Sequence, residues 1–341
     1  MAEKWLFWFE ELSAEHNDVV GKKCANLGEL TRLGLQVPPG FALSVNAYQR
    51  FLSETNADQE IREYVDQYVG ESQTLSQWAT TSDVLRQIVE SKDMPKDMAE
   101  TIRLEYDELS RKYGNQHMAV AVRSAGPVSH PGQYETYLNV RGATDLLEKI
   151  IKVWSSSFNP RSLAYRARKA LPLETDPIGV GILGMIDARA AGVTLTAEPN
   201  TGDYSKIVCE ANWGLGESVV SGRTTPDLFI LDKESLEILE RRLGEKEFCI
   251  LCTETGVAEE NVSSEKRSCF CMGDEEVKEI ANYGKSIEAY FKGIAQDVEW
   301  AISDQFPEGG KIFFLQTRPA IIAEKKSATD TILDWVMSRR S

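Results

Sequence analysis

The chain has 341 residues, of which 42% are hydrophobic and 27% are charged, a composition typical of a globular protein with room for more than one core. Acidic residues outnumber basic ones by 53 to 38, giving a net charge of -15, which opposes general nucleic-acid binding. No apolar run reaches membrane-spanning length and no secretory signal opens the chain, so we expect a cytoplasmic protein that does not engage a membrane.

The first part of the chain predicts a helix, an extended segment and then a long helical stretch. Residues 25–33 have helical periodicity, and Pro38, Pro39 and Gly40 end that helix. Residues 45–113 are polar and helix-rich, with Tyr48 and Phe51 on one face, which indicates a helical insertion packed on a core. Residues 118–122 then predict a buried strand.

The second part alternates strands and helices. Its predicted elements are helices at 146–158, 160–170 and 274–291 and strands at 178–186, 193–196, 206–210, 228–232 and two near the end of the chain. The helix at 274–291 is amphipathic, with Val277, Ile280, Ile287 and Tyr290 expected to point inward. Strands grouped at two places in the chain favour an α+β fold in two lobes.

Six cysteines are expected to be thiols in a reducing compartment. Cys249 and Cys252, with Cys269 and Cys271, come close to zinc-ribbon spacing, although the second pair lacks one spacer residue. The alternative is that these four are small apolar residues on two strands, and the sequence leaves both interpretations open.

The last predicted strands carry an acid and a Gln-x-Arg group, within 297–301 and 315–319. Asp297 and Glu299 lie on one strand, and Gln316 and Arg318 on the next. Oxygen ligands suit magnesium, and a planar guanidinium beside them neutralises moving phosphoryl groups. The alternative is an ordinary hairpin.

Three earlier segments have features of phosphate or ligand sites. Residues 21–29 place a glycine and lysines at a helix N-terminus, which attracts phosphate, although an ordinary capped helix is the alternative. Residues 123–133 place small residues beside Arg123, where backbone N–H groups could approach phosphate; a surface loop with a solvent-facing His130 is the alternative. Residues 210–223 combine glycines with Glu217, and could form a turn over a ligand or a plain connection.

Together these segments resemble the ATP-binding domain of phosphoenolpyruvate synthase and pyruvate phosphate dikinase, from about residue 8 to residue 320. The motifs are GKKCANLGEL, AVRSAGPVSHPGQYETYLNV, EANWGLGESVVSGRTTPD, DVEWA and LQTRP. The resemblance implies an α+β fold of ATP-grasp type that clamps ATP and Mg²⁺ between two lobes. We expect lobes at 1–187, including the insertion at 45–113, and at 188–322. A tail at 323–341 could form a helix that docks on a partner.

The resemblance also implies roles for individual residues. ATP is expected to contact Lys23, Arg123, Ser124, Thr136, Met185, Ile186, Glu217, Gln316 and Arg318. Lys23, Arg123 and Arg318 would act on the transferring phosphates as the catalytic cations, and Glu299 and Gln316 would hold magnesium. Met185 and Ile186 would lie at a hinge near the adenine. The sequence departs from the family at Pro127, where the dikinase has a second arginine, and at Leu183, where the synthase has glutamine.

Family members transfer the β-phosphoryl group of ATP to a histidine on a swivelling domain. His16, His117 and His130 do not lie in the glycine-rich setting of that histidine, so we expect a larger partner subunit to carry both it and the acceptor site. This arrangement resembles phenylphosphate synthase, which implies phenol as acceptor. The alternatives are a phosphoenolpyruvate synthase-like subunit acting on pyruvate or another small acceptor, a regulatory nucleotide-binding subunit without catalysis, and a fragment of a larger enzyme.

Overall fold

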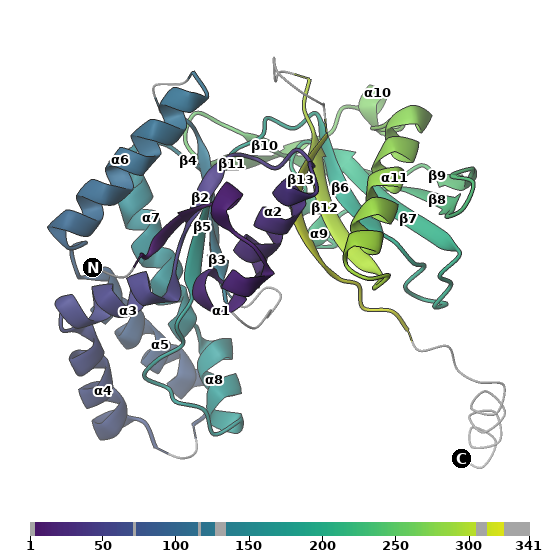
Figure 1. Cartoon of the computed structure of the whole chain (residues 1–341). Coiled ribbons are helices and arrows are strands. Elements are labelled where there is room, and N and C mark those ends of the chain that lie inside the picture. Colours follow the sequence, from purple (N-terminus) through teal and green to yellow (C-terminus); the bar gives the residue numbers. More distant parts are fainter. Residues whose placement is uncertain (1–3, 71–72, 115–116, 127–133, 305–311, 324–341) are drawn as a thin grey trace, which may run out of the picture. The chain divides into compact units, whose positions relative to one another are not determined.

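The computed structural model describes residues 4–70, 73–114, 117–126, 134–304 and 312–323 (Figure 1). Pro127, His130 and the tail from residue 324 lie outside these ranges, together with the predictions made for them. The chain forms two compact units. Unit 1 comprises Met1–Asp187, Leu251–Ala258 and Glu308–Gln316, and unit 2 comprises Ala188–Ile250, Glu259–Pro307 and Thr317–Ser341. The prediction treats each lobe as one continuous stretch, whereas the chain returns to unit 1 twice after residue 187.

Unit 1 is built on an antiparallel five-stranded sheet with the order β1-β2-β5-β3-β4. Its strands are β1 Leu6–Trp8, β2 Gly40–Leu43, β3 Val120–Ala125, β4 Thr136–Val140 and β5 Gly179–Gly184. Its α-helices are α1 Asn17–Val20, α2 Lys22–Arg32, α3 Val45–Glu54, α4 Ala57–Tyr68, α5 Leu75–Glu90, α6 Lys96–Lys112, α7 Ala143–Ser155 and α8 Pro160–Arg168. Short 3₁₀ turns lie at Phe9–Glu11, Ala14–His16 and Ser156–Phe158.

Helices cover both faces of this sheet, which follows from the alternation of side chains along β5. Val180 and Ile182 are fully buried in a hydrophobic core shared with α3 to α7. Gly179 points to the other face, where a Cβ atom would lie 2.6 Å from the carbonyl oxygen of Val20. The glycines in this strand therefore allow α1 and α2 to approach the sheet closely.

The helices α3 to α6 occupy residues 45–112, the stretch for which helical periodicity is predicted. Tyr48 and Phe51 are fully buried, and their rings pack against Trp154 of α7 at centroid distances of 5.4 and 5.0 Å. Ser44 caps α3 by accepting a hydrogen bond from the backbone N–H of Ala47. The helical layer is thus part of the unit 1 core.

Unit 2 is built on an antiparallel sheet with the order β13-β12-β6-β7-β8-β9. Its elements are β6 Ala190–Leu195, β7 Lys206–Trp213, α9 Glu217–Val220, β8 Asp227–Asp232, β9 Ile238–Arg242, α10 Ser264–Arg267, α11 Asp274–Tyr290 and β12 Gln296–Ile302. Three strands cross the boundary between the units along the chain: β10 Phe248–Cys252, β11 Val257–Asn261 and β13 Ile312–Pro319. The mixture of helices and antiparallel sheets confirms the predicted α+β class.

Helix α11 packs on β6, β7 and β12 and covers one face of this sheet. Trp300 is fully buried, and its indole N–H donates a hydrogen bond of 2.9 Å to Oγ1 of Thr194, which lies on the face that contacts α11. Val277, Ile280 and Ile287 of α11 are buried as predicted. Tyr290, the last residue of the helix, is 40% exposed instead.

The cysteine side chains are free thiols. Cys249 and Cys271 are buried and Cys269 is exposed, and no group of three or more His, Cys, Asp or Glu side chains suited to a metal occurs among the described residues. Cys249 and Cys252 lie on β10 as the apolar alternative expects, whereas Cys269 and Cys271 lie in a connection rather than on a second strand. Within the same described ranges, no helix is long and apolar enough to cross a membrane.

Candidate functional site: two clusters of charged residues

The N-terminus of α2 is attached to the end of β3 in unit 1. Gly21 precedes the helix with φ of +82°, and the backbone N–H of Lys22 donates a 3.2 Å hydrogen bond to the carbonyl oxygen of Gly126. A Cβ atom at Gly21 would lie 2.1 Å from the carbonyl oxygen of Ala125, so glycine is required on both steric and conformational grounds. The fold therefore brings the helix start that carries Lys23 to the strand that carries Arg123.

The buried thiol of Cys24 lies close to the positive charges of Arg123 and Lys23. Its side chain is 2% exposed, and burial raises the pKa of the thiol to about 12, against the opposing effect of the positive charges on Arg123 and Lys23. Both cations thus act on the same buried sulfur. This arrangement concentrates positive charge at the edge of a protein whose net charge is strongly negative, as a phosphate site in such a chain requires.

Arg123 joins two motifs that lie far apart in the sequence. Its Nη2 donates a 2.9 Å hydrogen bond to Oε1 of Gln316, and its Nη1 donates to the carbonyl oxygen of Leu315 at 3.4 Å. Gln316 is 5% exposed and Arg123 is half-buried. Two predicted site residues, 193 positions apart, are therefore in contact within unit 1.

Other predicted residues of unit 1 lie around this contact. Thr136 is exposed and pairs with Arg123 in the β3–β4 register, so both side chains point to the same face of the sheet. Ser124 is buried and points to the opposite face. Met185 and Ile186 follow the end of β5, where the backbone N–H of Met185 donates to the carbonyl oxygen of Ala119 at 2.8 Å. They directly precede Asp187, at which the first segment of unit 1 ends.

In unit 2, Arg318 is held by Asp297. Its Nε and Nη2 donate to the same carboxylate oxygen, Oδ2, at 2.8 and 2.7 Å. Burial raises the pKa of Asp297; the charge and hydrogen bonds of Arg318 oppose this shift, whereas the negative charge of Glu299 adds to it. The three charged groups therefore form one electrostatic cluster. Asp297 fixes the guanidinium of Arg318, and Glu299 lies close enough to raise the pKa of Asp297.

Asp297 and Glu299 lie on the face of the sheet that α11 does not cover. Val298 and Trp300 are buried while Asp297 and Glu299 alternate with them as half-buried residues. On the same face, Glu299 pairs with Val193, which in turn pairs with Glu210 on β7. Burial raises the pKa of Glu210, so this face carries a row of carboxylates in a partly desolvated setting.

Helix α9, which begins at Glu217, lies on this face as well. It contacts β6 and β7, and a Cβ atom at Gly216 would lie 3.7 Å from the Cβ of Ala191. Ala191 alternates with Thr194 and Gly192 and so points away from α11. The glycine-rich segment 210–223 and the acidic strand 297–301 therefore lie on one face of the unit 2 sheet. Glu217 is exposed to solvent.

The donor chemistry fits magnesium when a nucleotide supplies the remaining ligands. Magnesium takes an octahedron of oxygens, usually one or two from protein and the rest from phosphate and water. Glu299 offers a half-buried carboxylate, and the amide oxygen of Gln316 keeps a second lone pair beside the one that accepts from Arg123. No group of three or more His, Cys, Asp or Glu side chains placed to hold a metal occurs in the part of the chain that is described. Considered separately, Glu299 in unit 2 and Gln316 in unit 1 are each suited to provide one oxygen ligand.

The sequence reasoning missed the roles of two acids. Asp297 was noticed only as part of a strand, although its position two residues before Glu299 places both on one face. Glu210 opens a glycine-rich motif, and its position opposite Val193 follows only from the register of β6 and β7. The alternation of β12 could have found Asp297, whereas Glu210 needed the strand pairing.

Comparison with known protein families gives a match over most of the chain. The family model described as "Pyruvate phosphate dikinase, AMP/ATP-binding domain" matches residues 17–335. A solved structure of L-amino acid ligase from Bacillus licheniformis aligns with 79% of this chain and 55% of its own at 12% identity, with a TM-score of 0.25, which is too weak to support an argument about the fold.

Curated relatives are phosphoenolpyruvate synthases from archaea. The probable enzyme of Pyrococcus horikoshii is 33% identical over 97% of this chain and the enzyme of Pyrococcus furiosus is 33% identical over 96%. The probable enzyme of Methanocaldococcus jannaschii is 34% identical over 94%. The matched region covers 45% of each Pyrococcus protein and 27% of the third, so the chain spans less than half the length of these relatives.

Proposed function

Because the chain belongs to the pyruvate phosphate dikinase AMP/ATP-binding domain family, we propose that it performs the ATP half of a dikinase-type phosphotransfer. In this reaction ATP and water yield AMP and phosphate while the β-phosphoryl group passes to a histidine. Lys23 and Arg123 bind the phosphates, Glu299 and Gln316 hold magnesium, and Arg318 stabilises the transferring group. Such catalysis consists mainly of positioning and charge neutralisation.

The observation that carries this proposal is the hydrogen bond between Arg123 and Gln316. Two residues that a nucleotide site needs, one from each of two distant motifs, meet at 2.9 Å in unit 1. The pairing of Arg318 with Asp297 in unit 2 supports it, since a guanidinium held by a carboxylate keeps its remaining N–H donors in a fixed orientation. A purely structural role would not require one arginine to contact Gln316 and a second to be held by a half-buried aspartate.

We infer that a larger partner subunit carries the phosphorylatable histidine and the acceptor site. Among the described histidines, His16 Nδ1 already accepts a hydrogen bond from the backbone N–H of Ser13 at 3.2 Å. His117 is exposed and directly precedes the buried Met118. Neither is placed in a glycine-rich segment, which supports transfer to a histidine other than these two.

Phenol is the acceptor that the split arrangement suggests, by resemblance to phenylphosphate synthase. The names of the curated relatives favour pyruvate as the alternative acceptor. A regulatory subunit that binds nucleotide without catalysis is a third possibility, which intact Lys23, Arg123 and Arg318 argue against. The acceptor pocket would lie in the partner, so phenol, pyruvate and a regulatory role are distinguished by measuring turnover of the complex with each acceptor.

The first test is nucleotide binding by the purified chain. Calorimetric titration with ATP and magnesium should give saturable binding that weakens when Arg123 is replaced by Met. Arg62→Met, which removes an exposed ion pair with Asp58 on α4, is the matched control and should bind as the wild type does. Absence of ATP binding by the wild-type chain would refute the proposed function.

The second test is turnover by the complex that copurifies with the chain. AMP formation from β-labelled ATP should require phenol or pyruvate, and the label should pass through an acid-labile phosphohistidine on the partner. Phenol-dependent AMP with phenylphosphate would select the first acceptor, and pyruvate-dependent AMP would select the second. Arg318→Met should abolish transfer while ATP binding persists. Unchanged turnover in that variant would contradict the catalytic role.

A further inference from the structure

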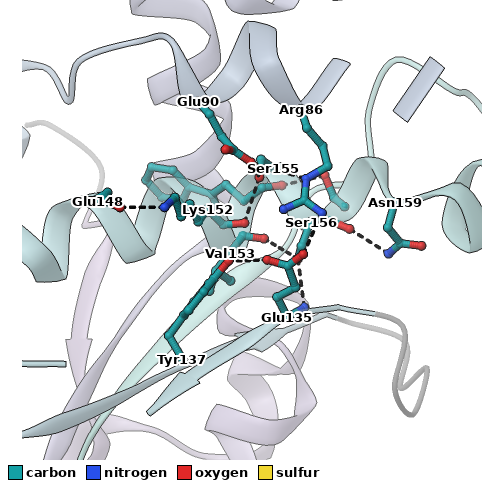
Figure 2. Close-up of polar contacts among 12 residues, drawn as sticks. Arg86, Glu90, Glu135, Tyr137, Glu148, Lys152, Val153, Ser155, Ser156 and Asn159 are labelled. Carbon is teal, nitrogen blue, oxygen red and sulfur yellow. Dashed lines mark hydrogen bonds and ion pairs between the residues drawn. The ribbon is translucent and has the colours of Figure 1, made fainter. Parts of the chain in front are cut away.

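A network of polar side chains ties the helical layer of unit 1 to the start of β4 (Figure 2). Arg86 of α5 donates from Nη1 to Oε1 of Glu135 at 2.6 Å, and from Nε to Oε1 of Glu90 at 3.3 Å. The hydroxyl of Tyr137 donates to the other carboxylate oxygen of Glu135. The backbone N–H of Glu135 donates to Oγ of Ser156 at 3.1 Å. Glu135 thus has partners on both carboxylate oxygens and on its backbone.

The partners of Glu135 are themselves fixed. Ser155 Oγ donates to Oε1 of Glu90 at 2.5 Å, and Ser156 Oγ donates to the carbonyl oxygen of Val153 at 2.7 Å. Both serines are fully buried at the end of α7. The network therefore connects α5, the C-terminus of α7 and the start of β4, and its two serine members are fully buried.

Partial burial makes this network stronger than a surface ion pair. The side chains of Arg86 and Glu135 are 26% and 37% exposed. Burial alone would lower the pKa of Arg86, yet its interactions with Glu135 and Glu90 raise it above the ordinary value. Burial and the neighbouring Glu135 carboxylate also raise the pKa of Tyr137. Charged hydrogen bonds in such a setting are less screened than those on an open surface.

The start of β4 needs this support because of its place in the sheet. β4 is an edge strand that pairs only with β3, and the pairing is irregular between Val120 and Val122. The strand begins at Thr136, so Glu135 is the residue immediately before it. An edge strand with one neighbouring strand has backbone hydrogen bonds on one side only to fix its first residue.

Alternation along β4 couples this network to the opposite face of the sheet. Glu135 and Tyr137 point toward the helices, so Thr136 between them points the other way. Thr136 pairs with Arg123, whose guanidinium contacts Gln316 on that face. A shift of Glu135 would move Thr136 and the strand segment opposite Arg123 together.

We propose that Arg86 and Glu135 are positioning residues of the nucleotide site: the ion pair on the helical face fixes the start of β4 so that Thr136 and Arg123 on the other face meet the phosphates in the correct geometry. The inference rests on the proposed function, because it assigns the network to that same ATP site. It also gives the helical insertion a role in binding, since α5 supplies the arginine.

The test compares ATP with adenosine, which lacks the phosphates. In titrations of the full chain, Arg86→Met and Glu135→Gln should each weaken magnesium–ATP binding about five- to tenfold, while adenosine binding changes by less than about twofold. The double variant should be no weaker than the worse single variant, because both remove one interaction. Arg86→Lys, which keeps the charge but not the planar fork, should recover part of the affinity.

Arg50→Met is the matched control. Arg50 forms comparable ion pairs with Glu54 and Asp97 in the same helical layer, but none of these residues touches β4. The Arg50→Met variant should therefore bind ATP with the affinity of the wild type. The positioning role would be overturned if Arg86→Met and Glu135→Gln lost ATP and adenosine affinity equally, or if they lost no ATP affinity. Normal ATP binding by the wild-type chain would leave the proposed function intact in either case. Failure of the wild-type chain to bind ATP would overturn both.

Discussion

A buried ion pair in unit 2 makes the sharpest stability prediction. Lys246 and Asp227 are both fully buried, with Nζ 2.5 Å from Oδ1. The same carboxylate accepts hydrogen bonds of 2.8 Å from the backbone N–H groups of Gly244, on Oδ1, and Cys271, on Oδ2. Lys246→Met removes the cation and leaves a charged carboxylate in the core with two backbone N–H donors and the thiol of Cys271.

The expected cost follows from the partners that remain. Removing one member of a buried ion pair costs about 3–5 kcal/mol. Because two backbone N–H groups still stabilise Asp227, we expect the lower end of this range, about 3 kcal/mol. For a domain of 150–250 residues, 1 kcal/mol shifts the melting temperature by roughly 2–4 °C. Lys246→Met should therefore lower the melting temperature of unit 2 by roughly 6–12 °C.

Differential scanning calorimetry measures this change, and hydrogen exchange of β8 assigns the transition to unit 2. Arg241→Met is the control, because Arg241 pairs with Asp274 on an exposed part of the same unit and should melt as the wild type does. The double variant Asp227→Asn, Lys246→Met should be more stable than Lys246→Met, since it no longer buries a lone charge. A shift for Lys246→Met no larger than that of Arg241→Met would refute the reasoning.

Three further predictions concern the site and its surroundings. Gly21→Ala should destabilise the protein by about 1–3 kcal/mol and weaken ATP binding, because φ is +82° and the new Cβ would collide with Ala125; unchanged melting and affinity would contradict this. Burial raises the pKa of Glu210 above 4.5, so the folded state binds its proton more tightly and stability falls as pH rises from 4.5 through the folded pKa. Glu210→Gln should match the wild type at acidic pH and exceed it at neutral pH in urea denaturation; a pH-independent difference would argue against it. A disulfide reagent at mildly alkaline pH should modify the exposed Cys269 before Cys24, because burial raises the pKa of Cys24 to about 12. Mass spectrometry of the folded chain measures the order of modification, and modification of Cys24 first would contradict this prediction.

The sequence by itself determined the local elements and the motifs. Helical periodicity located the stretch from residue 45 to 112, and Gly21 located the start of α2, because turn chemistry and side-chain spacing act over a few residues. Alternation on β12 contains the information that Asp297 and Glu299 share one face, although the sequence analysis assigned a role to Glu299 alone. Tyr290 was placed wrongly because periodicity gives a direction around a helix, whereas burial at its last residue depends on how far the sheet extends.

Only the tertiary structure decided which of these elements meet. The pairing of Arg123 with Gln316, 193 positions apart, and the burial of Lys246 against Asp227 result from strand register and packing over long sequence separations. The same holds for Arg86 and Glu135, since a charged residue on a helix predicts a solvated face unless an element from elsewhere in the chain covers it. Long-range contacts form because the whole core is buried at once, and no short segment of sequence contains that information.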